Sequence, residues 1–254
     1  MPRRNDPAKL KKARLDTALV DRGFFSSREQ AQRAIMAGEV RVGEAVIDKA
    51  SANIAPDAAI TVESSPAYVG RGGLKLEGAL RDFSIEVAGI IALDIGASTG
   101  GFTDCLLQHS AKKVYAIDVG HGQLAWKIRN DPRVVVREKL NARYLSPADI
   151  PELAQLCVID VSFISLTLIL PKAFESVTAN GMILALIKPQ FELEASDVGR
   201  GGIVREPVLH AKAQEKIRHF VVDAGHEVIG IVPSAITGTD GNQEFFICVR
   251  KQSA

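Results

Sequence analysis

The 254-residue sequence is poor in the side chains that build disulfide frameworks and clustered metal sites. It has only three cysteines, at Cys105, Cys157 and Cys248, and each stands alone in an apolar stretch far from the others. This spacing contains no CxxC pattern and is unlike the dense cysteine framework of a small secreted domain. We therefore expect reduced core cysteines in a cytoplasmic protein, and no metal ion.

Long hydrophobic runs are also missing. The most apolar segment, residues 156–171, is interrupted by Asp160 and by serines, so it is not expected to span a bilayer. The N-terminus is basic, but no apolar region of the kind found in a signal peptide follows it. The sequence therefore predicts a protein without a membrane-spanning or secretory segment.

The charge is nearly balanced overall but unevenly distributed. The net charge is +1, and hydrophobic and charged residues make up 46% and 24% of the chain, as in an ordinary globular protein. Residues 1–41 hold ten Lys or Arg and five Asp or Glu, a net of +5, so the remainder carries −4. A basic module on a mildly acidic body favours a polyanionic partner. The alternative is a solvated charged face without a partner.

The N-terminal part predicts a small α+β module. A first helix carries Leu15, Leu19 and Val20 at helical spacing and ends near Gly23. A second helix starts at a capping box from Ser26 to Glu29 and ends at Gly38, and short alternating strands follow it. This module is expected over residues 8–64, with a linker over 65–71 that begins in the break Ser64-Ser65-Pro66-Ala67.

Residues 72–254 show strands that alternate with helices, which is typical of a mostly parallel sheet covered by helices on both faces. The fold class expected is therefore α/β and Rossmann-like, preceded by the small α+β module, with an antiparallel last strand. The expected strands are 90–94, 114–118, 156–160, 182–187, 227–232 and 244–251, and the expected helices are 102–108, 166–177 and 208–224. Trp126, the single tryptophan, is expected to pack rather than to stack on a base.

A glycine-rich turn follows the first of these strands and opens a helix. Glycines there let the backbone approach a ligand, and the helix N-terminus supplies free N–H groups. The dinucleotide pattern GxGxxG fails because Ser98 takes the place of its middle glycine, which disfavours a nicotinamide enzyme. An acidic residue, Asp94, precedes the first glycine, Gly96, as in methyltransferase turns, where the acid faces the amino-acid part of the cofactor.

A second acidic residue follows the next strand. Asp118 lies about 20 residues further on, where a carboxylate can accept hydrogen bonds from two ribose hydroxyls. The alternative interpretation is that Asp94 and Asp118 merely cap helix N-termini. Their joint spacing favours a nucleoside-containing cofactor.

The candidate reaction centre lies where two further strands end. Asp160 closes one strand, and Lys188 closes the next, which Pro189 terminates. The Asn/Asp-Pro-Pro-aromatic pattern of enzymes that methylate base amino groups is missing, and Cys157 lies inside its strand, where it is better placed as a core residue than as a nucleophile. By elimination, a hydroxyl is the favoured acceptor. Taken singly, such charged residues are more often solvated than catalytic.

The N-terminal segment RLDTALVDRGFFSSREQAQRAIMAGEVRVG resembles the S4 RNA-binding domain, and the order Lys75, Asp160, Lys188 and Glu244 resembles the catalytic tetrad of ribose 2′-O-methyltransferases related to FtsJ. The whole chain resembles the TlyA family, also named hemolysin A. The matching stretches cover nearly all of residues 14–250 and are GRGGLKLEGAL, LDIGASTGGFTDCLL, IDVGHGQLAWKIRNDPRVV, DVSFISL, LIKPQFE, GRGGIVREP and GNQEFFICV.

This resemblance implies a class I methyltransferase that uses S-adenosyl-L-methionine to methylate a ribose 2′-hydroxyl, that of cytidine, in ribosomal RNA. Because the sequence stops just after its last strand, 23S RNA of the large ribosomal subunit is expected as the substrate. The implied catalytic residues are Lys75, Asp160, Lys188 and Glu244. The implied cofactor-binding residues are Asp94, Gly96, Ala97, Ser98, Gly100, Asp118 and Asn141. The implied RNA-binding residues are Arg14, Arg22, Arg28, Arg33, Arg41, Arg71 and Arg200.

The role of Lys188 stays open between two forms of the side chain. A neutral lysine would remove the hydroxyl proton, and Lys75 as a neighbouring cation favours that form. Asp160 favours the ammonium form, which would instead stabilise the developing oxyanion. The loop that carries Arg200, residues 199–202, either binds phosphates or is a simple turn.

Two other functions are weighed against methyl transfer. A pore-forming toxin, suggested by the name hemolysin, needs a membrane segment that the sequence does not contain. A catalytically silent RNA-binding or ribosome-assembly factor is disfavoured because the expected cofactor and catalytic residues are all present. The oligomeric state is left open.

Overall fold

The computed structural model describes residues 12–36, 38–62, 67–238 and 240–253. Its chain divides into two compact units, residues 1–67 and 68–254. Most of the predicted break, from Ser64 to Pro66, lies outside the described residues. Tyr68 to Arg71, which the sequence analysis assigns to the linker, belong to the second unit, where Tyr68 is buried.

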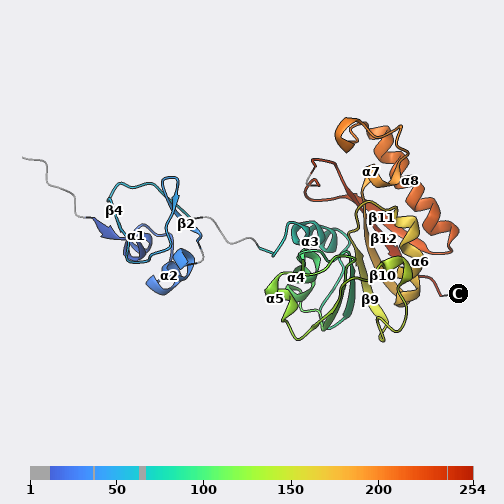
Figure 1. The fold of residues 1–254 in the computed structure, drawn as a ribbon, viewed down its shortest axis with the longest axis horizontal. Coiled ribbons are helices and arrows are strands. Elements are labelled where there is room, and N and C mark those ends of the chain that lie inside the picture. Colours follow the sequence, from blue (N-terminus) through green and yellow to red (C-terminus); the bar gives the residue numbers. More distant parts are fainter. Residues whose placement is uncertain (1–11, 37, 63–66, 239, 254) are drawn as a thin grey trace, which may run out of the picture. The chain divides into compact units, whose positions relative to one another are not determined.

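The first unit packs two short helices against two small sheets (Figure 1). Its elements are β1 (Ala13–Arg14), α1 (Leu15–Asp21), α2 (Arg28–Met36), β2 (Val40–Val42), β3 (Ala45–Val46), β4 (Asn53–Ile54) and β5 (Ile60–Val62). β1 pairs with β4, and β3, β2 and β5 form an antiparallel sheet in that order. Leu15, Leu19, Ala31 and Ile35 are buried between the helices, as their spacing predicts. The predicted capping box is wrong by one residue, because Ser27 Oγ accepts from Gln30 N at the start of α2.

The second unit contains a seven-stranded sheet in the order β11-β12-β10-β9-β6-β7-β8. Five neighbouring strands, β10, β9, β6, β7 and β8, run parallel, whereas β12 is antiparallel to both of its neighbours. The strands are β6 (Ile91–Ile95), β7 (Lys113–Ile117), β8 (Val134–Arg137), β9 (Ala154–Ile159), β10 (Val177–Ile187), β11 (Glu227–Pro233) and β12 (Phe245–Arg250). The predicted α/β class with an antiparallel last strand is confirmed.

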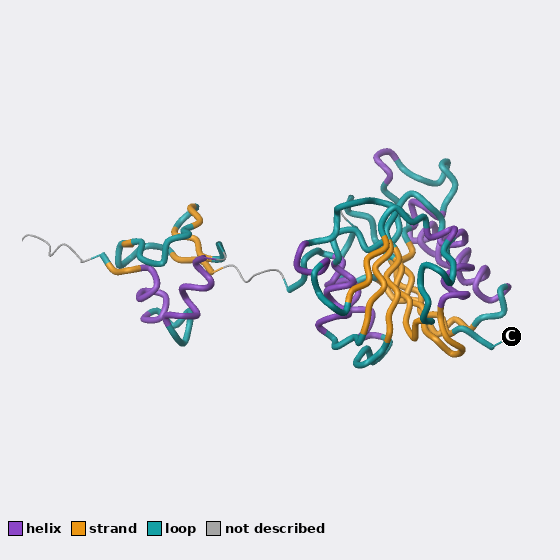
Figure 2. The backbone as a smooth tube through the Cα atoms, turned by 60° about the horizontal axis from the view of Figure 1, so that its bottom comes forward, coloured by secondary structure: helices purple, strands orange, loops and turns teal. Residues whose placement is uncertain are grey.

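Helices cover both faces of this sheet (Figures 1 and 2). One face carries α3 (Gly72–Asp82), α4 (Gly101–Gln108) and α5 (Trp126–Arg129); the other carries α6 (Leu170–Ser176) and α8 (Pro207–Asp223). Short elements connect them: the 3-10 turns η1 (Ala142–Tyr144), η2 (Leu166–Leu168) and η3 (Arg200–Gly202), and the helix α7 (Pro189–Glu192). Successive residues of β6 show the two layers, because Ala92 packs with the α3–α4 core and Leu93 with the α6–α8 core.

Two sequence-based expectations about this unit need correction. The half-buried edge strand β8 is missing from the predicted elements, because its four residues lie between charged and turn residues. Trp126, expected to pack, is 80% exposed at the start of α5.

The topology brings several chain segments to one edge of the sheet. β6, β9 and β10 are parallel and hydrogen-bonded in the order β10-β9-β6, so the residues that follow them emerge side by side. β12 is antiparallel, and its first residue, Phe245, pairs with the last residue of β10, Ile187. The start of β12 therefore meets the ends of the parallel strands, which places Glu244 beside Lys188 in the sheet.

Candidate active site

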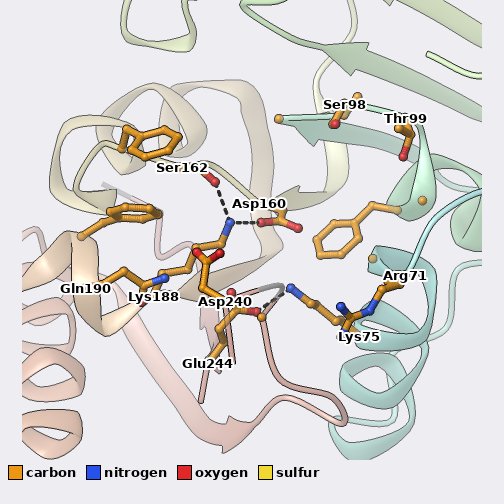
Figure 3. Close-up of a pocket in the computed structure, with 18 residues that line it drawn as sticks. Arg71, Lys75, Ser98, Thr99, Asp160, Ser162, Lys188, Gln190, Asp240 and Glu244 are labelled. Atoms are coloured by element: carbon orange, nitrogen blue, oxygen red, sulfur yellow. Dashed lines mark hydrogen bonds and ion pairs between the residues drawn. The ribbon is translucent and has the colours of Figure 1, made fainter. Parts of the chain in front are cut away.

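The structure brings the four predicted catalytic residues into the lining of one cavity of about 430 Å³ (Figure 3). Lys188 Nζ lies 2.7 Å from Asp160 Oδ1 and donates a hydrogen bond to Ser162 Oγ at 2.9 Å. Lys75 Nζ donates to Glu244 Oε2 at 2.5 Å. The cavity wall thus carries two separate lysine–carboxylate pairs.

The Lys75–Glu244 pair is held by close packing around α3 and β12. Lys75 lies in the first turn of α3, and its helix is seated on α4 by glycines: a Cβ on Gly72 would lie 3.2 Å from the ring of Phe102. Around Glu244, a Cβ on Gly238 would come within 2.7 Å of the carboxylate. The backbone of Glu244 also accepts from Ser234 N at 2.8 Å.

Asp160 is positioned by direct contact between the ends of β9 and β6. Its backbone N donates to Ile95 O at 3.0 Å. Gly96, with φ of +89°, passes so close that a Cβ there would lie 2.2 Å from the Asp160 carbonyl oxygen. Only glycine tolerates both this left-handed backbone and this distance. The first glycine of the turn therefore serves the reaction centre as well as the expected cofactor site.

A buried carboxylate joins the loops that follow β9 and β10. Glu192 accepts from Ser165 Oγ at 2.5 Å and from Leu166 N at 2.8 Å, and Lys216 Nζ of α8 lies 3.1 Å from it. Because Asp160 lies upstream of Ser165 and Lys188 upstream of Glu192, this cluster fixes the two loops to one another. At the cavity, the rings of Phe163 and Phe191 lie 5.1 Å apart between centroids.

A second cavity, also of about 430 Å³, lies on the other side of the glycine-rich turn. Gly96, Ser98, Asp160, Ser162 and Phe163 line both cavities, so the two share one wall. The second cavity is otherwise lined by the ends of β6 and β7 and by the segment around Asn141: Ile95, Ile117, Asp118, Val119, Gly120, Gln123, Leu140, Asn141, Ala142, Val161, Ile164 and Ile169. Its size and its strand-end position suit a nucleoside.

The residues expected to bind the cofactor differ in whether they line a cavity. Ser98 and Ala97 line the cavities, and Asp118 does so while its carboxylate accepts from Ser98 N at 2.7 Å and from Gly120 N at 2.6 Å. Asn141 lines the second cavity and caps η1 by accepting from Arg143 N. Gly100 lines neither cavity: a Cβ there would lie 2.9 Å from Leu124, so its role in the structure is packing.

Asp94 is fully buried behind the turn. Thr103 Oγ1 donates to its Oδ2 at 2.6 Å, whereas Oδ1 has no hydrogen-bond partner among the described residues. Burial raises the pKa of Asp94 to about 7, although the Thr103 hydrogen bond opposes this. An orphaned buried carboxylate oxygen next to a nucleoside-sized cavity fits a cationic ligand group, such as the amino group of S-adenosylmethionine.

The three cysteines are free and buried, as the sequence predicts. Burial raises the pKa of the Cys157 thiol inside β9, which keeps it protonated and unsuited to act as a nucleophile. A cysteine-based transfer to cytosine carbon therefore has no support in the described residues.

Among the arginines expected to bind RNA, four already make contacts inside the first unit, and one of them is Arg41, which donates to Glu44 O at 3.3 Å. Arg14 and Arg28 both pair with the buried Asp16 at 2.9 Å, and Arg14 in particular holds the pKa of that carboxyl well below its usual range. Arg22 donates to the carbonyls of Ala58 and Pro56. The sequence did not reveal that these side chains also have structural roles.

The expected arginines also differ in position. Arg33 is exposed on α2, and Arg41 is half-buried in β2. Arg71 lines the catalytic cavity and donates to Thr237 O at 3.0 Å. For Arg200, the backbone belongs to η3 and the side chain lies outside the described residues.

Several cavity residues escaped the sequence analysis. Ser162, Phe163, Gln190, Phe191 and Asp240 line the catalytic cavity beside the predicted tetrad. Phe163 is 91% exposed, which is unusual for phenylalanine. The signal available in the sequence was their position, since all but Asp240 lie within three residues of Asp160 or Lys188.

No helix in the described part of the chain is long and apolar enough to cross a membrane.

The fold and the site define a class of protein: an α/β methyltransferase-type domain with a charged cavity at its strand ends, preceded by a separate small module. The FtsJ-like methyltransferase model matches residues 68–251, and the S4 domain model matches residues 13–60. The chain belongs to the FtsJ-like methyltransferases, and within them to the TlyA family.

Named relatives support this membership, and the first of them matches nearly the full length of this chain. The 16S/23S rRNA (cytidine-2′-O)-methyltransferase TlyA of Mycobacterium tuberculosis is 44% identical over 245 residues, 96% of this chain and 91% of that protein. The 23S rRNA (cytidine-2′-O)-methyltransferase TlyA of Campylobacter jejuni is 34% identical over 184 residues, 72% of this chain and 70% of that protein. A solved structure described as a hemolysin of Streptococcus thermophilus is 44% identical, has a TM-score of 0.73, and covers 96% of this chain and 90% of its own.

Family membership makes the chain an S-adenosylmethionine-dependent methyltransferase. The cavities fit this cofactor: one is nucleoside-sized, an orphaned carboxylate oxygen lies behind the turn, and a catalytic wall adjoins both.

Proposed function

We propose that this protein transfers a methyl group from S-adenosylmethionine to the ribose 2′-hydroxyl of a cytidine in 23S ribosomal RNA. The observation that carries the proposal is the pair of lysine–carboxylate contacts in the catalytic cavity, which adjoins the nucleoside-sized cavity at Asp160. Cytidine 2′-hydroxyls are the targets in the names of both TlyA relatives, and 23S RNA is common to those names.

The cofactor takes the cavity between β6, β7 and the segment around Asn141. Asp118, Gly96 and Ser98 line this cavity, and they would hold the ribose hydroxyls and the part of the cofactor next to the turn. Asp94 does not line the cavity, but its unpartnered Oδ1 lies buried next to Ile95 and Gly96, which do, and it would compensate the charge of the amino group. When bound, S-adenosylmethionine supplies a methyl group that needs no further activation. The protein's task is therefore to align the acceptor oxygen and to manage its proton.

The acceptor ribose takes the cavity with the four charged residues. A lysine ammonium has three N–H groups. Lys188 donates one to Ser162 and is paired with Asp160 by charge, which leaves an N–H for the 2′-oxygen. Lys188 in this form stabilises negative charge that develops on the oxygen. The hydroxyl proton is left on the Lys188–Asp160 pair, which changes from ammonium–carboxylate to ammonium–carboxylic acid.

The second pair has a different role in this proposal. Lys75 and Glu244 are bound to each other and almost completely buried, so their charges compensate within the cavity wall. They form the part of the cavity wall against which the ribose lies. Because the two charges compensate each other, neither acts on Lys188 as an unpaired neighbouring charge.

The S4 domain supplies affinity for RNA. It carries the exposed Arg33 and the net positive charge of the N-terminal part, and in the catalytic unit Arg71 adds a positive charge to the cavity lining. We place the S4 domain at residues 8–64 and start the catalytic domain at Tyr68, because Tyr68 to Arg71 belong to the second unit. The substrate is an RNA in a ribosomal subunit, which implies a cytoplasmic site of action.

One experiment tests the proposal directly. The protein is incubated with methyl-labelled S-adenosylmethionine and separated ribosomal subunits, and the labelled RNA is digested to nucleosides. We expect label in large-subunit RNA, on a ribose that makes the following bond resistant to alkali. Base-methylated product would refute the ribose assignment, and RNA binding without any label would favour a silent assembly factor.

A further inference from the structure

Gln190 is a polar side chain of the catalytic cavity that the mechanism does not use. Its Oε1 is buried and has no hydrogen-bond partner, and no described residue is bonded to its Nε2. A buried amide oxygen without a donor is destabilising, so such groups are rare unless a ligand completes them. The orphaned amide therefore points to a ligand group that approaches from the cavity.

The backbone under Gln190 is held firmly. Pro189 opens α7 immediately before it, and Phe191 N donates to Lys188 O at 2.9 Å. Two residues later, Glu192 is bound by Ser165, Leu166 N and Lys216. An amide carried on such a fixed turn keeps one position relative to Lys188, which is a requirement for reading a ligand.

The position also fits the base of the nucleotide whose ribose meets Lys188. Gln190 follows Lys188 by two residues, so their Cα atoms are separated by at most about 7 Å. The rings of Phe163 and Phe191 line the same cavity and offer flat apolar surface for a base. Figure 3 shows Gln190 beside Lys188 in the cavity wall. A base that lay along these rings, with its 2′-oxygen at Lys188, would therefore have its edge within reach of the amide.

We infer that Gln190 is the residue that selects cytosine, by accepting a hydrogen bond from the N4 amino group through Oε1 and donating one to N3 through Nε2. The inference rests on the proposed function, since it names the element that chooses the base for that reaction. Uracil presents an acceptor at position 4 and a donor at N3, so it leaves Oε1 facing O4 unless the amide reverses. The same cavity thus combines a ribose-directed lysine with a base-directed amide.

The test compares two substrates and two matched variants. Once the modified nucleotide has been mapped, large subunits are prepared with the native cytidine or with uridine at that position. The kcat/KM for each is measured for the wild type, for Gln190→Met, and for Gln214→Met. Gln214 lies on α8 and lines neither cavity, so its change controls for loss of an amide elsewhere.

We expect the wild type and Gln214→Met to prefer cytidine by roughly ten- to hundred-fold. Gln190→Met should lose about that factor on cytidine and little on uridine, so that its preference falls to within a few-fold. Gln190→Glu keeps an acceptor for N4 and loses the donor to N3, so it should methylate cytidine slowly; because a carboxylate can also accept from uracil N3, its preference for cytidine should fall as well. S-adenosylmethionine affinity, measured by calorimetry, should be unchanged in every variant.

A preference for cytidine that survives in Gln190→Met would overturn the inference, and so would a wild type that does not discriminate between the two subunits. Failure of the proposed function gives a different result, namely no ribose methylation by the wild type on either substrate. If Gln190→Met does not fold, Gln190→Glu decides the matter by its rate on cytidine, because an unchanged rate there excludes the N3 contact.

Discussion

Lys75 and Glu244 stand 169 residues apart in the sequence, yet Lys75 Nζ lies 2.5 Å from Glu244 Oε2. Their side chains are only 9% and 4% exposed, so each charge depends on the other for compensation. The pair joins the first helix of the catalytic unit to its last strand, on the wall of the catalytic cavity.

We expect the Lys75–Glu244 pair to be replaceable for stability but not for activity. Lys75→Met leaves Glu244 buried without its partner and should lower the free energy of unfolding by roughly 3–5 kcal/mol. The double variant Lys75→Met/Glu244→Leu should recover most of that loss, because two apolar side chains replace two compensated charges. Denaturant unfolding measures the stability, and methyl transfer to ribosomal subunits measures the activity. The double variant should stay inactive, and a stable, active double variant would remove both residues from the reaction.

Lys188 should be dispensable for binding and necessary for rate. Lys188→Ala is expected to fold, bind S-adenosylmethionine and bind RNA, and to lose roughly 10²–10⁴-fold in rate, which is the range for general-base or electrostatic terms. Lys188→Arg separates the two roles, since a guanidinium keeps its charge and does not deprotonate. Because Lys188 is paired with Asp160 and Ser162, we expect the arginine variant to retain more rate than the alanine variant. Equal rates in the two would favour the base role.

Asp94 should make the ligand-free protein less stable as pH rises. Its pKa in the folded state is raised to about 7 by burial, against about 3.9 for an unfolded chain. Between these values the folded state holds the extra proton, so this group's contribution to stability falls as pH rises through that window and is lowest above pH 7. Asp94→Asn should therefore raise the Tm relative to wild type by several degrees at pH 8 and by much less at pH 5. A thermal-unfolding series from pH 4.5 to 8 with no such trend would contradict the buried, charged state.

The same substitution should weaken the cofactor. Asp94→Asn removes the orphaned carboxylate oxygen, and calorimetry should show a higher Kd for S-adenosylmethionine, while RNA affinity in a filter-binding assay stays close to that of the wild type. Unaltered cofactor affinity would mean that Asp94 only accepts the hydrogen bond from Thr103 and stabilises the turn.

Gly96 should tolerate no side chain. Gly96→Ala places a methyl group 2.2 Å from the Asp160 carbonyl oxygen at a left-handed φ, so the turn and the end of β9 must move apart. We expect loss of both cofactor binding and methyl transfer. Gly225→Ala is the matched control, because Gly225 has a φ of +80° with nothing within 4 Å of the added Cβ. It should cost about 1 kcal/mol of stability and leave cofactor binding intact. Equal losses in the two variants would point to backbone strain alone.

Removing residues 1–64 should leave a folded catalytic domain, since residues 68–254 form a compact unit of their own. Calorimetry should show unchanged S-adenosylmethionine binding, while RNA affinity and methylation of subunits fall. Full-length RNA binding should weaken steeply with salt as phosphate contacts release counterions, and the truncated protein should show a shallower slope. A truncated protein that methylates subunits as fast as the full chain would contradict the role given to the S4 domain.

The sequence predicted the architecture well where the period of the apolar residues and the turn residues at the ends of a segment indicate the same helix or strand. The apolar run before Asp160 and the helix 208–224 lie within a residue or two of β9 and α8. β8 was missed because three valines between charged neighbours are too short a signal, and only pairing with β7 makes them a strand. The order of β11, β12 and β10 also depends on long-range pairing that spacing along the chain does not encode.

The candidate site, too, could be predicted from the sequence only where the signal is local. Single charged residues at strand ends were foreseeable, because parallel strands present their ends together. The partner of each was not, since Lys75 pairs with Glu244 and Lys188 with Asp160 only through the fold. Asp16 was overlooked for the same reason: nothing in its surroundings in the sequence shows that Arg14 and Arg28 converge on it.

The wall shared by the two cavities has a kinetic consequence. The two cavities adjoin at Gly96, Ser98, Asp160, Ser162 and Phe163, which line both, while the rest of each lining is separate. The two ligands can therefore be bound together and meet at this junction, so direct transfer passes through a ternary complex and needs no methylated enzyme between two half-reactions. Spent cofactor can then be exchanged while the ribosomal RNA stays bound. S-adenosylhomocysteine would compete with S-adenosylmethionine for its cavity without competing for that of the RNA.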